Sequence, residues 1–214
     1  MSKSKSSLSV KGKTVFYCVI GTVIMAMIIA ASFYFDEAVR QFMFAHQNST
    51  TRSFMTTVSR FGDWPEHVLV GLVLVALAQW RSSIEWKRVL LAMLIALAIA
   101  GLIGRAIKIS TGRARPGVKS EQMWTGPHLT GAKYHSFPSG HVDASMGFFG
   151  VLFLARRRLG LACLPIPILI GFSRLYLGAH YLSDVVCAAV LGVLCALLVW
   201  RFFPPKMENL ESKI

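Results

Sequence analysis

The sequence SRLYLGAHYLSDVVCAAVLGVLCALLVW, residues 173–200, passes from a polar segment into sixteen positions, 185–200, that carry no charge. Such a run is typical of a helix in a lipid bilayer, because lipid offers no hydrogen-bond partner and a helix satisfies its backbone internally. In the polar part, His180 and Asp184 are four residues apart and so share one face of a helix. This stretch predicts a membrane span with titratable side chains at its mouth.

Five other apolar runs precede this one, and together they predict an all-α, six-span transmembrane helical bundle. The six runs cover residues 15–35, 68–80, 89–104, 142–155, 159–172 and 185–200. Several are shorter than the roughly 18 residues of a full span, so their partly polar ends must complete the crossing. The first run is long enough to remain as an anchor and not be cleaved as a signal peptide. Hydrophobic residues make up 54% of the 214 residues and charged residues only 15%, which excludes an ordinary soluble domain.

The charge distribution predicts the topology. The net charge is +13, but the cations lie at the ends of apolar runs and in polar clusters, which argues for a membrane protein and against a nucleic-acid partner. With both termini cytoplasmic, every inside segment is basic, as the positive-inside rule requires. We therefore expect one domain, residues 1–214, in the bacterial inner membrane. Its non-spanning parts would be a basic cytoplasmic tail (1–13), an outside connector (36–60), an active-site loop (105–140) and a second cytoplasmic tail (204–214).

The connector and the cysteines carry less information. Residues 36–60 have amphipathic character, which is compatible with a helix lying at the interface or with a plain connector. The four cysteines all lie in apolar stretches and none has C-x-x-C spacing, so neither a zinc site nor a disulfide framework is expected.

Three short polar clusters interrupt the apolar chain. They are KISTGRARP at residues 108–116, PSGH at 138–141 and SRLYLGAHYLSD at 173–184. The order of the spans places the first two between spans three and four, and the last between spans five and six. All three therefore fall on the same, non-cytoplasmic side. This parity predicts one shared site at the outer membrane–water interface.

The second cluster has the properties of an anion site. Ser139 stands where span four begins, a favoured N-cap position, and Gly140 lets the backbone approach a ligand closely. The unpaired N–H groups of the first helical turn and the helix dipole favour an anion there. His141 belongs to the same turn. An ordinary helix cap with an interfacial histidine is the alternative interpretation.

The other two clusters supply fixed cations and a histidine–carboxylate pair. Lys108 offers a point charge and Arg115 a planar donor fork that matches phosphate oxygens. Arg174 lies at the outer end of span five. Asp184 can accept one imidazole N–H of His180, fix its tautomer and leave the other nitrogen free to attack. A basic juxtamembrane loop and a simple His–Asp helix pair are the alternatives, although a carboxylate at a membrane boundary is usually functional.

The three clusters resemble the K-x6-R-P, P-S-G-H and S-R-x5-H-x3-D signatures of the type 2 phosphatidic acid phosphatase family, whose membrane branch dephosphorylates lipids. Every defining position is filled, and the motifs span residues 108–184. The resemblance implies that His180 is the nucleophile, that Asp184 orients it, and that His141 protonates the leaving group and later activates water. It also implies a common role in holding the phosphate oxygens for Lys108, Arg115, Ser139, Gly140 and Arg174.

The resemblance further implies a metal-independent lipid phosphatase with a phosphohistidine intermediate and no cofactor. Its partners would be membrane lipids and a lipid phosphate substrate: undecaprenyl pyrophosphate, phosphatidylglycerol phosphate, phosphatidic acid or a lipid A phosphate. Lipid-to-lipid phosphotransfer through the same intermediate is the main alternative. Vanadate-dependent halide oxidation is disfavoured by the six spans, and a non-catalytic lipid-binding role by the complete residue set.

Several polar residues keep open roles at this stage. Asp143 suits the helix dipole at the first turn of span four, or it tunes His141. The loop residues contact a head group or shape the loop; they are Trp124, His128, Lys133 and His135. His46 and His67 are expected at the surface or the interface.

Overall fold

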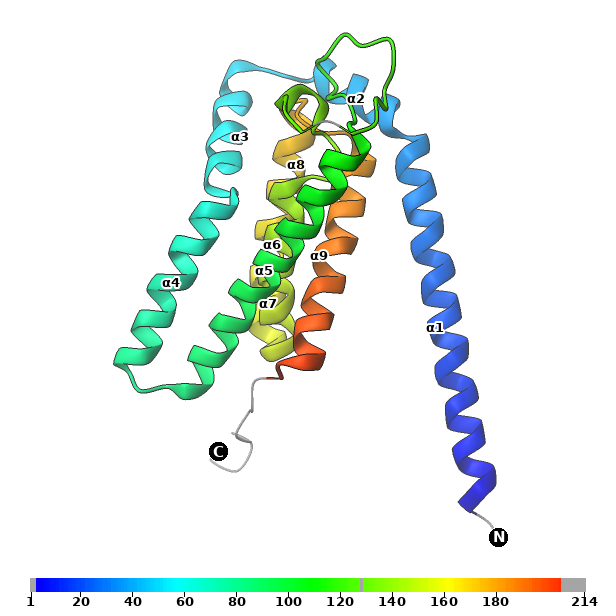
Figure 1. Cartoon of the computed structure of the whole chain (residues 1–214), viewed down its shortest axis with the longest axis vertical. Helices are drawn as coiled ribbons and strands as arrows, with labels where there is room; N and C mark the ends of the chain where they lie inside the picture. The colour runs from blue at the N-terminus through cyan, green and yellow to red at the C-terminus, as the bar shows by residue number, and fades with distance from the viewer. Residues whose placement is uncertain (1–2, 128, 205–214) are drawn as a thin grey trace.

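The computed structural model describes residues 3–127 and 129–204, and their regular secondary structure is helical apart from one isolated bridge between Arg113 and Trp124. The helices are α1 (Lys3–Tyr34), α2 (Asp36–Ala45), α3 (Ser49–Phe61), α4 (Trp64–Trp80), α5 (Ile84–Thr111), the short 3₁₀ helix η1 (Ala132–Tyr134), α6 (Gly140–Ala155), α7 (Arg157–Cys163), α8 (Pro165–Tyr176) and α9 (Leu182–Phe202). The all-α prediction is confirmed for the described residues (Figure 1).

The centre of the bundle is formed by α5, α6 and α9, which pack on one another along their lengths. Small residues permit this close packing. A Cβ atom at Gly147 of α6 would lie 3.0 Å from the carbonyl oxygen of Ala96 in α5. A Cβ atom at Gly192 of α9 would lie 2.6 Å from the backbone oxygen of Asp143 in α6. The three helices therefore form a rigid frame for the residues at their ends.

Four helical segments are long and apolar enough to cross a membrane: Val15–Tyr34, Ile84–Thr111, Arg157–Tyr176 and Leu182–Phe202. Ser49–Phe61 and Trp64–Trp80 qualify as a fifth only together, with a bend of 53° between them. Gly140–Ala155 is apolar but has only 16 residues. These helices indicate a multi-pass membrane protein, with four candidate spans among the described residues, or five if the bent pair is counted as one. The fourth predicted span, residues 142–155, lies on the short α6.

The remaining helix boundaries differ from the sequence-based ones in three places. The segment 36–60 is two helices, α2 and α3, and α3 continues into α4 through the bend at Gly62 and Asp63. The run 159–172 is divided between α7 and α8, because Pro165 begins a new helix and cannot donate a backbone hydrogen bond. The basic tail is helical from Lys3 onward, and of the second tail only residue 204 is described.

The predicted active-site loop, 105–140, is too long at its start. Helix α5 continues to Thr111 and stops at Gly112, whose φ of 55° is in the left-handed region that glycine adopts without strain. The loop therefore covers residues 112–139, and Lys108 stands on the last turn of a rigid helix.

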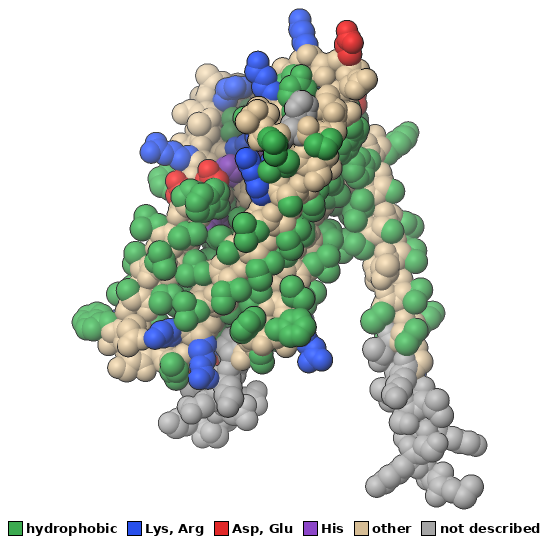
Figure 2. Space-filling model, viewed as in Figure 1, with side chains coloured by type: hydrophobic (Ala, Val, Ile, Leu, Met, Phe, Trp, Pro, Cys, Tyr) green, Lys and Arg blue, Asp and Glu red, His purple; other side chains and the backbone are tan. Residues whose placement is uncertain are grey.

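Helix α1 lies apart from the central bundle (Figure 1), and its main contacts with other helices are with α9 and α2. Many of its apolar side chains are exposed, as expected of a helix that faces lipid. In Figure 2, apolar side chains cover the middle of the molecule, and most of the Lys and Arg side chains gather at its two ends. This belt matches the apolar zone of a bilayer.

Candidate active site

The structure brings the three polar clusters to one end of the bundle, opposite the α4–α5 turn (Figure 1). Lys108 comes from the last turn of α5, and Arg115 from the loop after it. Ser139, Gly140 and His141 form the start of α6. Three further residues complete the set at the end of α8 and the beginning of α9: Arg174, His180 and Asp184.

His180 and Asp184 lie side by side and are fully or almost fully buried. Nδ1 of His180 is 3.5 Å from Oδ2 of Asp184, slightly longer than a normal hydrogen bond, and such contacts often tighten only when substrate binds. Burial lowers the pKa of His180 to about 3, although the Asp184 carboxylate acts in the opposite direction. The imidazole is therefore neutral near pH 7, as a nucleophile must be.

Asp184 is fixed by three hydrogen bonds that leave it no rotational freedom. Its Oδ1 accepts from Arg113 at 2.5 Å, and its Oδ2 accepts from the Ser136 hydroxyl at 2.6 Å and the Tyr181 amide at 2.8 Å. The backbone oxygen of Asp184 accepts from the Ser139 amide at 3.1 Å. The last bond ties the start of α9 directly to the start of α6, so the two catalytic candidates His180 and His141 are held in one frame.

Arg113 connects Asp184 to a second buried carboxylate, Asp36, at the start of α2. Its second guanidinium nitrogen donates to Asp36 at 2.7 Å, and Ser183 donates to both oxygens of Asp36 through its amide and hydroxyl. Arg113 itself is 1% exposed. We call this set the Arg113 network; its members are Arg113, Asp36, Asp184, Ser183 and Ser136.

Aromatic rings surround the guanidinium of Arg113. Its central carbon lies 4.4 Å from the ring centroid of Tyr181, 4.7 Å from Trp124 and 5.6 Å from Phe33. Cation–π contacts of this kind are strongest when water is excluded. Trp124 therefore shapes the loop around Arg113, which was one of the two roles open for it.

Lys108 holds the loop that precedes α6. Its ammonium donates to the carbonyl oxygens of His135 at 3.1 Å and Pro138 at 2.6 Å. The side chain is 9% exposed and lines a cavity. Ser139 occupies the N-cap position of α6, as predicted, but its hydroxyl makes no capping bond and is buried without a partner. That hydroxyl is available to a ligand.

Arg115 and Arg174 have donors that no protein group satisfies. The Nε atom of each is buried and lacks a hydrogen-bond partner, whereas Arg174 donates from another nitrogen to the Ser59 hydroxyl. Lys108, Arg115 and Arg174 interact electrostatically with one another and with His141. We call Lys108, Arg115, Arg174, Ser139 and Gly140 the cationic seat. Three cations held this close repel one another, so an anionic ligand would stabilise the arrangement.

His141 has a carboxylate partner of its own. Its Nδ1 lies 3.6 Å from Oδ1 of Asp63, which also accepts the amide of Trp64 at the start of α4. Asp63 is the N-cap of α4 and stands at the bend between α3 and α4. Two histidine–carboxylate pairs thus flank the cationic seat, one from α9 and one between α4 and α6.

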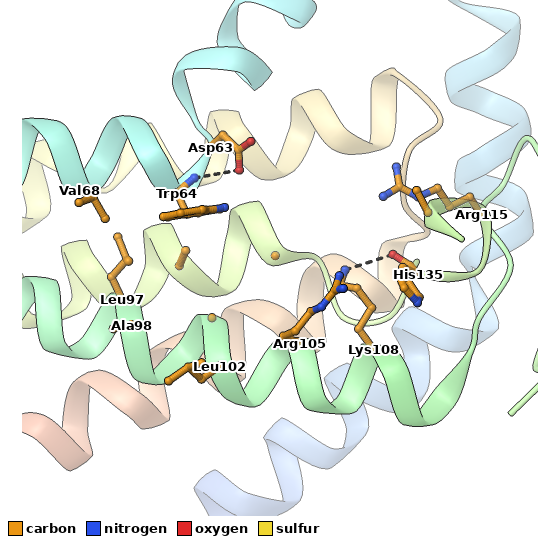
Figure 3. Close-up of a pocket in the computed structure, with 14 residues that line it drawn as sticks. Asp63, Trp64, Val68, Leu97, Ala98, Leu102, Arg105, Lys108, Arg115 and His135 are labelled. Atoms are coloured by element: carbon orange, nitrogen blue, oxygen red, sulfur yellow. Dashed lines mark hydrogen bonds between the residues drawn. The ribbon is translucent and has the colours of Figure 1, made fainter. Parts of the chain in front are cut away.

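A cavity of about 820 Å³ opens beside the seat, between α4, α5 and α6 (Figure 3). One end is polar and contains Lys108, Arg115 and Arg105, and the Asp63 carboxylate and His135 also line the cavity. The other end is lined by apolar side chains from α4 and α5; they include Trp64, Val68, Leu97, Ala98 and Leu102. The cavity is therefore amphipathic along its length.

The structure also locates most of the other polar residues whose roles the sequence left open. His135 is buried and lines the cavity, while Lys133 is exposed and offers only its backbone oxygen, to the Arg115 amide. His128 lies outside the described residues. His67, expected at the surface, is 6% exposed because it packs edge-on against Phe148 and Phe149.

Asp143 is fully buried and neither of its carboxylate oxygens has a hydrogen-bond partner. Its carboxylate lies against Gly104 of α5, where a Cβ atom would come within 2.0 Å of Oδ2. Gly104 precedes Lys108 by one helical turn, and the Coulombic interaction of Asp143 with Lys108 is favourable. Within the site, the electrostatic interaction of Asp143 is thus with Lys108.

Sequence reasoning missed Asp36, Asp63, Ser136 and Ser183, and did not assign Arg113 a role. Asp36 directly follows the first apolar run, residues 15–35, and begins the predicted connector. A signal was present, because a carboxylate next to a membrane span is expensive unless it is paired. Its partner could not be identified from local spacing, because Arg113 lies 77 positions away.

Comparison with known proteins matches the chain to one protein family and to several phosphatases. The family model described as "PAP2 superfamily" matches residues 89–208. The chain is 30% identical over 74% of its length to an undecaprenyl-diphosphatase of Bacillus subtilis, covering 78% of that protein. It is 34% identical over 45% of its length to a lipid A 1-phosphatase of Rhizobium etli, covering 42% of that protein. A crystal structure of a transmembrane PAP2-type phosphatidylglycerolphosphate phosphatase from Bacillus subtilis has the same fold, with a TM-score of 0.67 and 22% identity over 90% of this chain and 98% of that one.

Proposed function

The chain belongs to the PAP2 superfamily, and from this premise we propose that it is a metal-independent lipid phosphatase that transfers the phosphoryl group through His180 to water. The observation that carries the proposal is the amphipathic cavity. Its polar end is lined by Lys108 and Arg115, and Lys108 interacts electrostatically with Arg174, His141 and His180. Its apolar end lies between the helices. A phosphate with a lipid tail has the same distribution of charge and apolar surface.

In the proposed first step, Nε2 of His180 attacks phosphorus and the bond from phosphorus to the bridging oxygen breaks. Asp184 faces Nδ1 and stabilises the positive charge that develops on the ring. The Arg113 network supports this role, because Asp184 is fixed by the hydrogen bonds from Arg113, Ser136 and the Tyr181 amide. The nucleophile therefore needs no reorganisation during the reaction.

The cationic seat would hold the non-bridging oxygens of the transferred group. Phosphoryl transfer depends mainly on positioning and on stabilisation of charge at these oxygens. The unsatisfied Nε atoms of Arg115 and Arg174 and the Ser139 hydroxyl are suitable donors. Fixed cations would thus perform the task that Mg²⁺ performs in other phosphoryl-transfer enzymes. Among the described residues, no three His, Cys, Asp or Glu side chains are grouped as metal ligands.

His141 would act as general acid and then as general base. In the free protein, burial and the neighbouring cations lower the pKa of His141 to about 3, so it would take up its proton when the anionic phosphate binds. It gives a proton to the departing bridging oxygen, so that the lipid leaves as an alcohol or as a phosphate monoester. It then accepts a proton from water, which attacks the phosphohistidine, releases inorganic phosphate and restores His180. Asp63 faces the opposite ring nitrogen and would hold His141 in the required tautomer.

We further propose that the site faces the non-cytoplasmic side of the bacterial inner membrane, with both termini in the cytoplasm and six crossings in all. The support is the concentration of Lys and Arg in the segments at the opposite end of the bundle, including residues 81–88 and 156–158. Attachment of a membrane-impermeant thiol reagent to single cysteines placed at positions 83 and 119 tests this topology. We expect labelling of intact spheroplasts at position 119 only.

The proposed reaction is tested by phosphate release from lipid phosphates by the purified full chain in detergent with excess EDTA. We expect turnover to persist in EDTA and to fall by more than about 10⁴-fold in His180→Ala, as expected when a covalent nucleophile is removed. His46→Ala is the matched control, because His46 is an exposed histidine that does not line the cavity. Loss of all turnover on chelation, or full activity of His180→Ala, would contradict the proposal. Radiolabel appearing in a second lipid with little free phosphate would replace hydrolysis by lipid-to-lipid phosphotransfer.

A further inference from the structure

Arg105 is a cation of the cavity that none of the three motifs contains. It lines the cavity together with Lys108 and Arg115. It makes no hydrogen bond or ion pair with any described residue. An arginine that lines a cavity between helices and has no partner in the protein is free to bind a ligand there.

The position of Arg105 along α5 is the decisive observation. The residues of α5 that line the cavity are Leu97, Ala98, Gly101, Leu102, Arg105 and Lys108. They follow the three-to-four-residue spacing of one helical face, so their sequence order is also their order along the cavity. Figure 3 shows the apolar side chains at one end, and Arg105 and Lys108 rising from the same helix toward the other. The Cα atom of Arg105 therefore lies about 4.5 Å along the helix axis from that of Lys108, on the apolar side of it.

This level of the cavity is where the group that joins the phosphate to the tail must lie. With the terminal phosphoryl group in the cationic seat and the tail beside Leu97 and Leu102, the linking group reaches the level of Arg105. In a phosphatidate or a phosphatidylglycerol phosphate the atoms next to the terminal phosphate belong to an uncharged glycerol. In a lipid diphosphate the linking group is a second, negatively charged phosphate. A guanidinium matches the second phosphate and offers nothing comparable to glycerol.

We propose that Arg105 makes this protein selective for lipid diphosphates, by binding the phosphate that remains on the lipid. This inference rests on the proposed function. When His180 attacks the terminal phosphorus, the bond to the bridging oxygen breaks and the lipid leaves as a phosphate monoester. The negative charge that develops on this leaving group lies next to Arg105. The interaction therefore strengthens in the transition state and contributes to kcat as well as to KM.

The test compares two substrates with identical tails, farnesyl diphosphate and farnesyl monophosphate, in detergent with the full-length protein. The wild type should have the higher kcat/KM for the diphosphate. Arg105→Gln should reduce kcat/KM for the diphosphate by about tenfold or more, the effect of losing a charge-assisted hydrogen bond, and change that for the monophosphate by less than about twofold. Arg105→Lys should retain part of the preference, because it keeps the charge and loses the donor fork.

Arg60→Gln is the matched control, since Arg60 is an exposed arginine of α3 that does not line the cavity. The inference is overturned if Arg105→Gln affects both substrates equally, if it affects neither, or if Arg60→Gln produces the same selective loss. In those cases hydrolysis of both lipids by the wild type would leave the proposed function standing. If the wild type released phosphate from neither lipid, the proposed function would fail, and this inference with it.

Discussion

The Arg113 network and the cationic seat lie next to each other but differ in how their polar atoms are satisfied. In the network, both carboxylates are buried and every one of their oxygens accepts at least one hydrogen bond. In the seat, buried donor atoms of Arg115, Arg174 and Ser139 have no partner in the protein. The Nε atom of Arg113 is also buried without a partner, but Arg113 forms ion pairs with both carboxylates of the network. The three cations of the seat form no ion pair with any described residue.

This difference implies that the network mainly stabilises the fold and that the seat mainly binds the substrate. A satisfied buried network stabilises one geometry and is strongly disrupted when a single member is removed. Each unsatisfied buried donor destabilises the free protein by about 1–3 kcal/mol, and this penalty is removed when a substrate oxygen binds. Substitutions in the network should therefore affect folding first, and substitutions in the seat should affect substrate binding first.

The largest effect is expected from Arg113→Ala. The substitution leaves Asp36 and Asp184 buried without their cation, a change that destabilises proteins by about 3–5 kcal/mol. We expect a much lower melting temperature in detergent and loss of activity. The additional substitution Asp36→Asn should recover part of the stability, because one buried negative charge is removed. A melting temperature equal to that of the wild type would contradict the role given to the network.

His141→Ala tests the proton-transfer part of the site. We expect kcat to fall by about 10²–10⁴-fold, the usual contribution of a general acid–base group, while the melting temperature changes little because His141 is only partly buried. Asp63→Asn should give a smaller fall of the same kind. If the melting temperature fell in parallel with the activity, His141 would have a structural role like that of the Arg113 network.

Arg174→Lys and Arg113→Lys form a matched pair across the two regions. Both keep the charge and lose the planar fork. In the seat, we expect Arg174→Lys to raise KM about tenfold without a change in melting temperature, because charge-assisted hydrogen bonds to substrate oxygens are lost. In the network, Arg113→Lys should lower the melting temperature, because one lysine cannot reach both carboxylates. If the two variants changed the melting temperature and KM to the same extent, the distinction between a stabilising network and a substrate-binding seat would be wrong.

The smallest effect is expected where Asp143 of α6 packs against Gly104 of α5. Gly104→Ala places a Cβ atom against the Asp143 carboxylate, at 2.0 Å from Oδ2 before relaxation. Overpacking of this kind destabilises by about 1–3 kcal/mol, which thermal unfolding in detergent can measure. Gly101→Ala is the control, since its Cβ atom would meet no atom within 4 Å. An equal shift for the two variants, or an unchanged penalty when Asp143 is also replaced by Ala, would exclude the contact as the cause.

The apolar runs predicted the positions of the helices well, because an apolar segment in lipid must satisfy its backbone hydrogen bonds internally, as a helix does. The boundaries were less accurate where a local residue decides them. Gly112 ends α5 seven residues later than the start expected for the loop, and Pro165 divides one expected span into two helices. The six-span topology stays a prediction, since α6 is short and α4 reaches the required length only with α3.

The sequence by itself determined the chemistry of the candidate site: a helix start with Ser139 and Gly140, cations near it, and a histidine four residues before a carboxylate. These are local features, set by spacing along the chain. Only the tertiary structure decided which distant charges compensate one another. Arg113 joins Asp36 to Asp184, Asp63 reaches His141, and Arg105 takes its level in the cavity from the packing of α4, α5 and α6. The physical reason is that a buried charge needs a partner in space, and helix packing chooses that partner without regard to its distance in sequence.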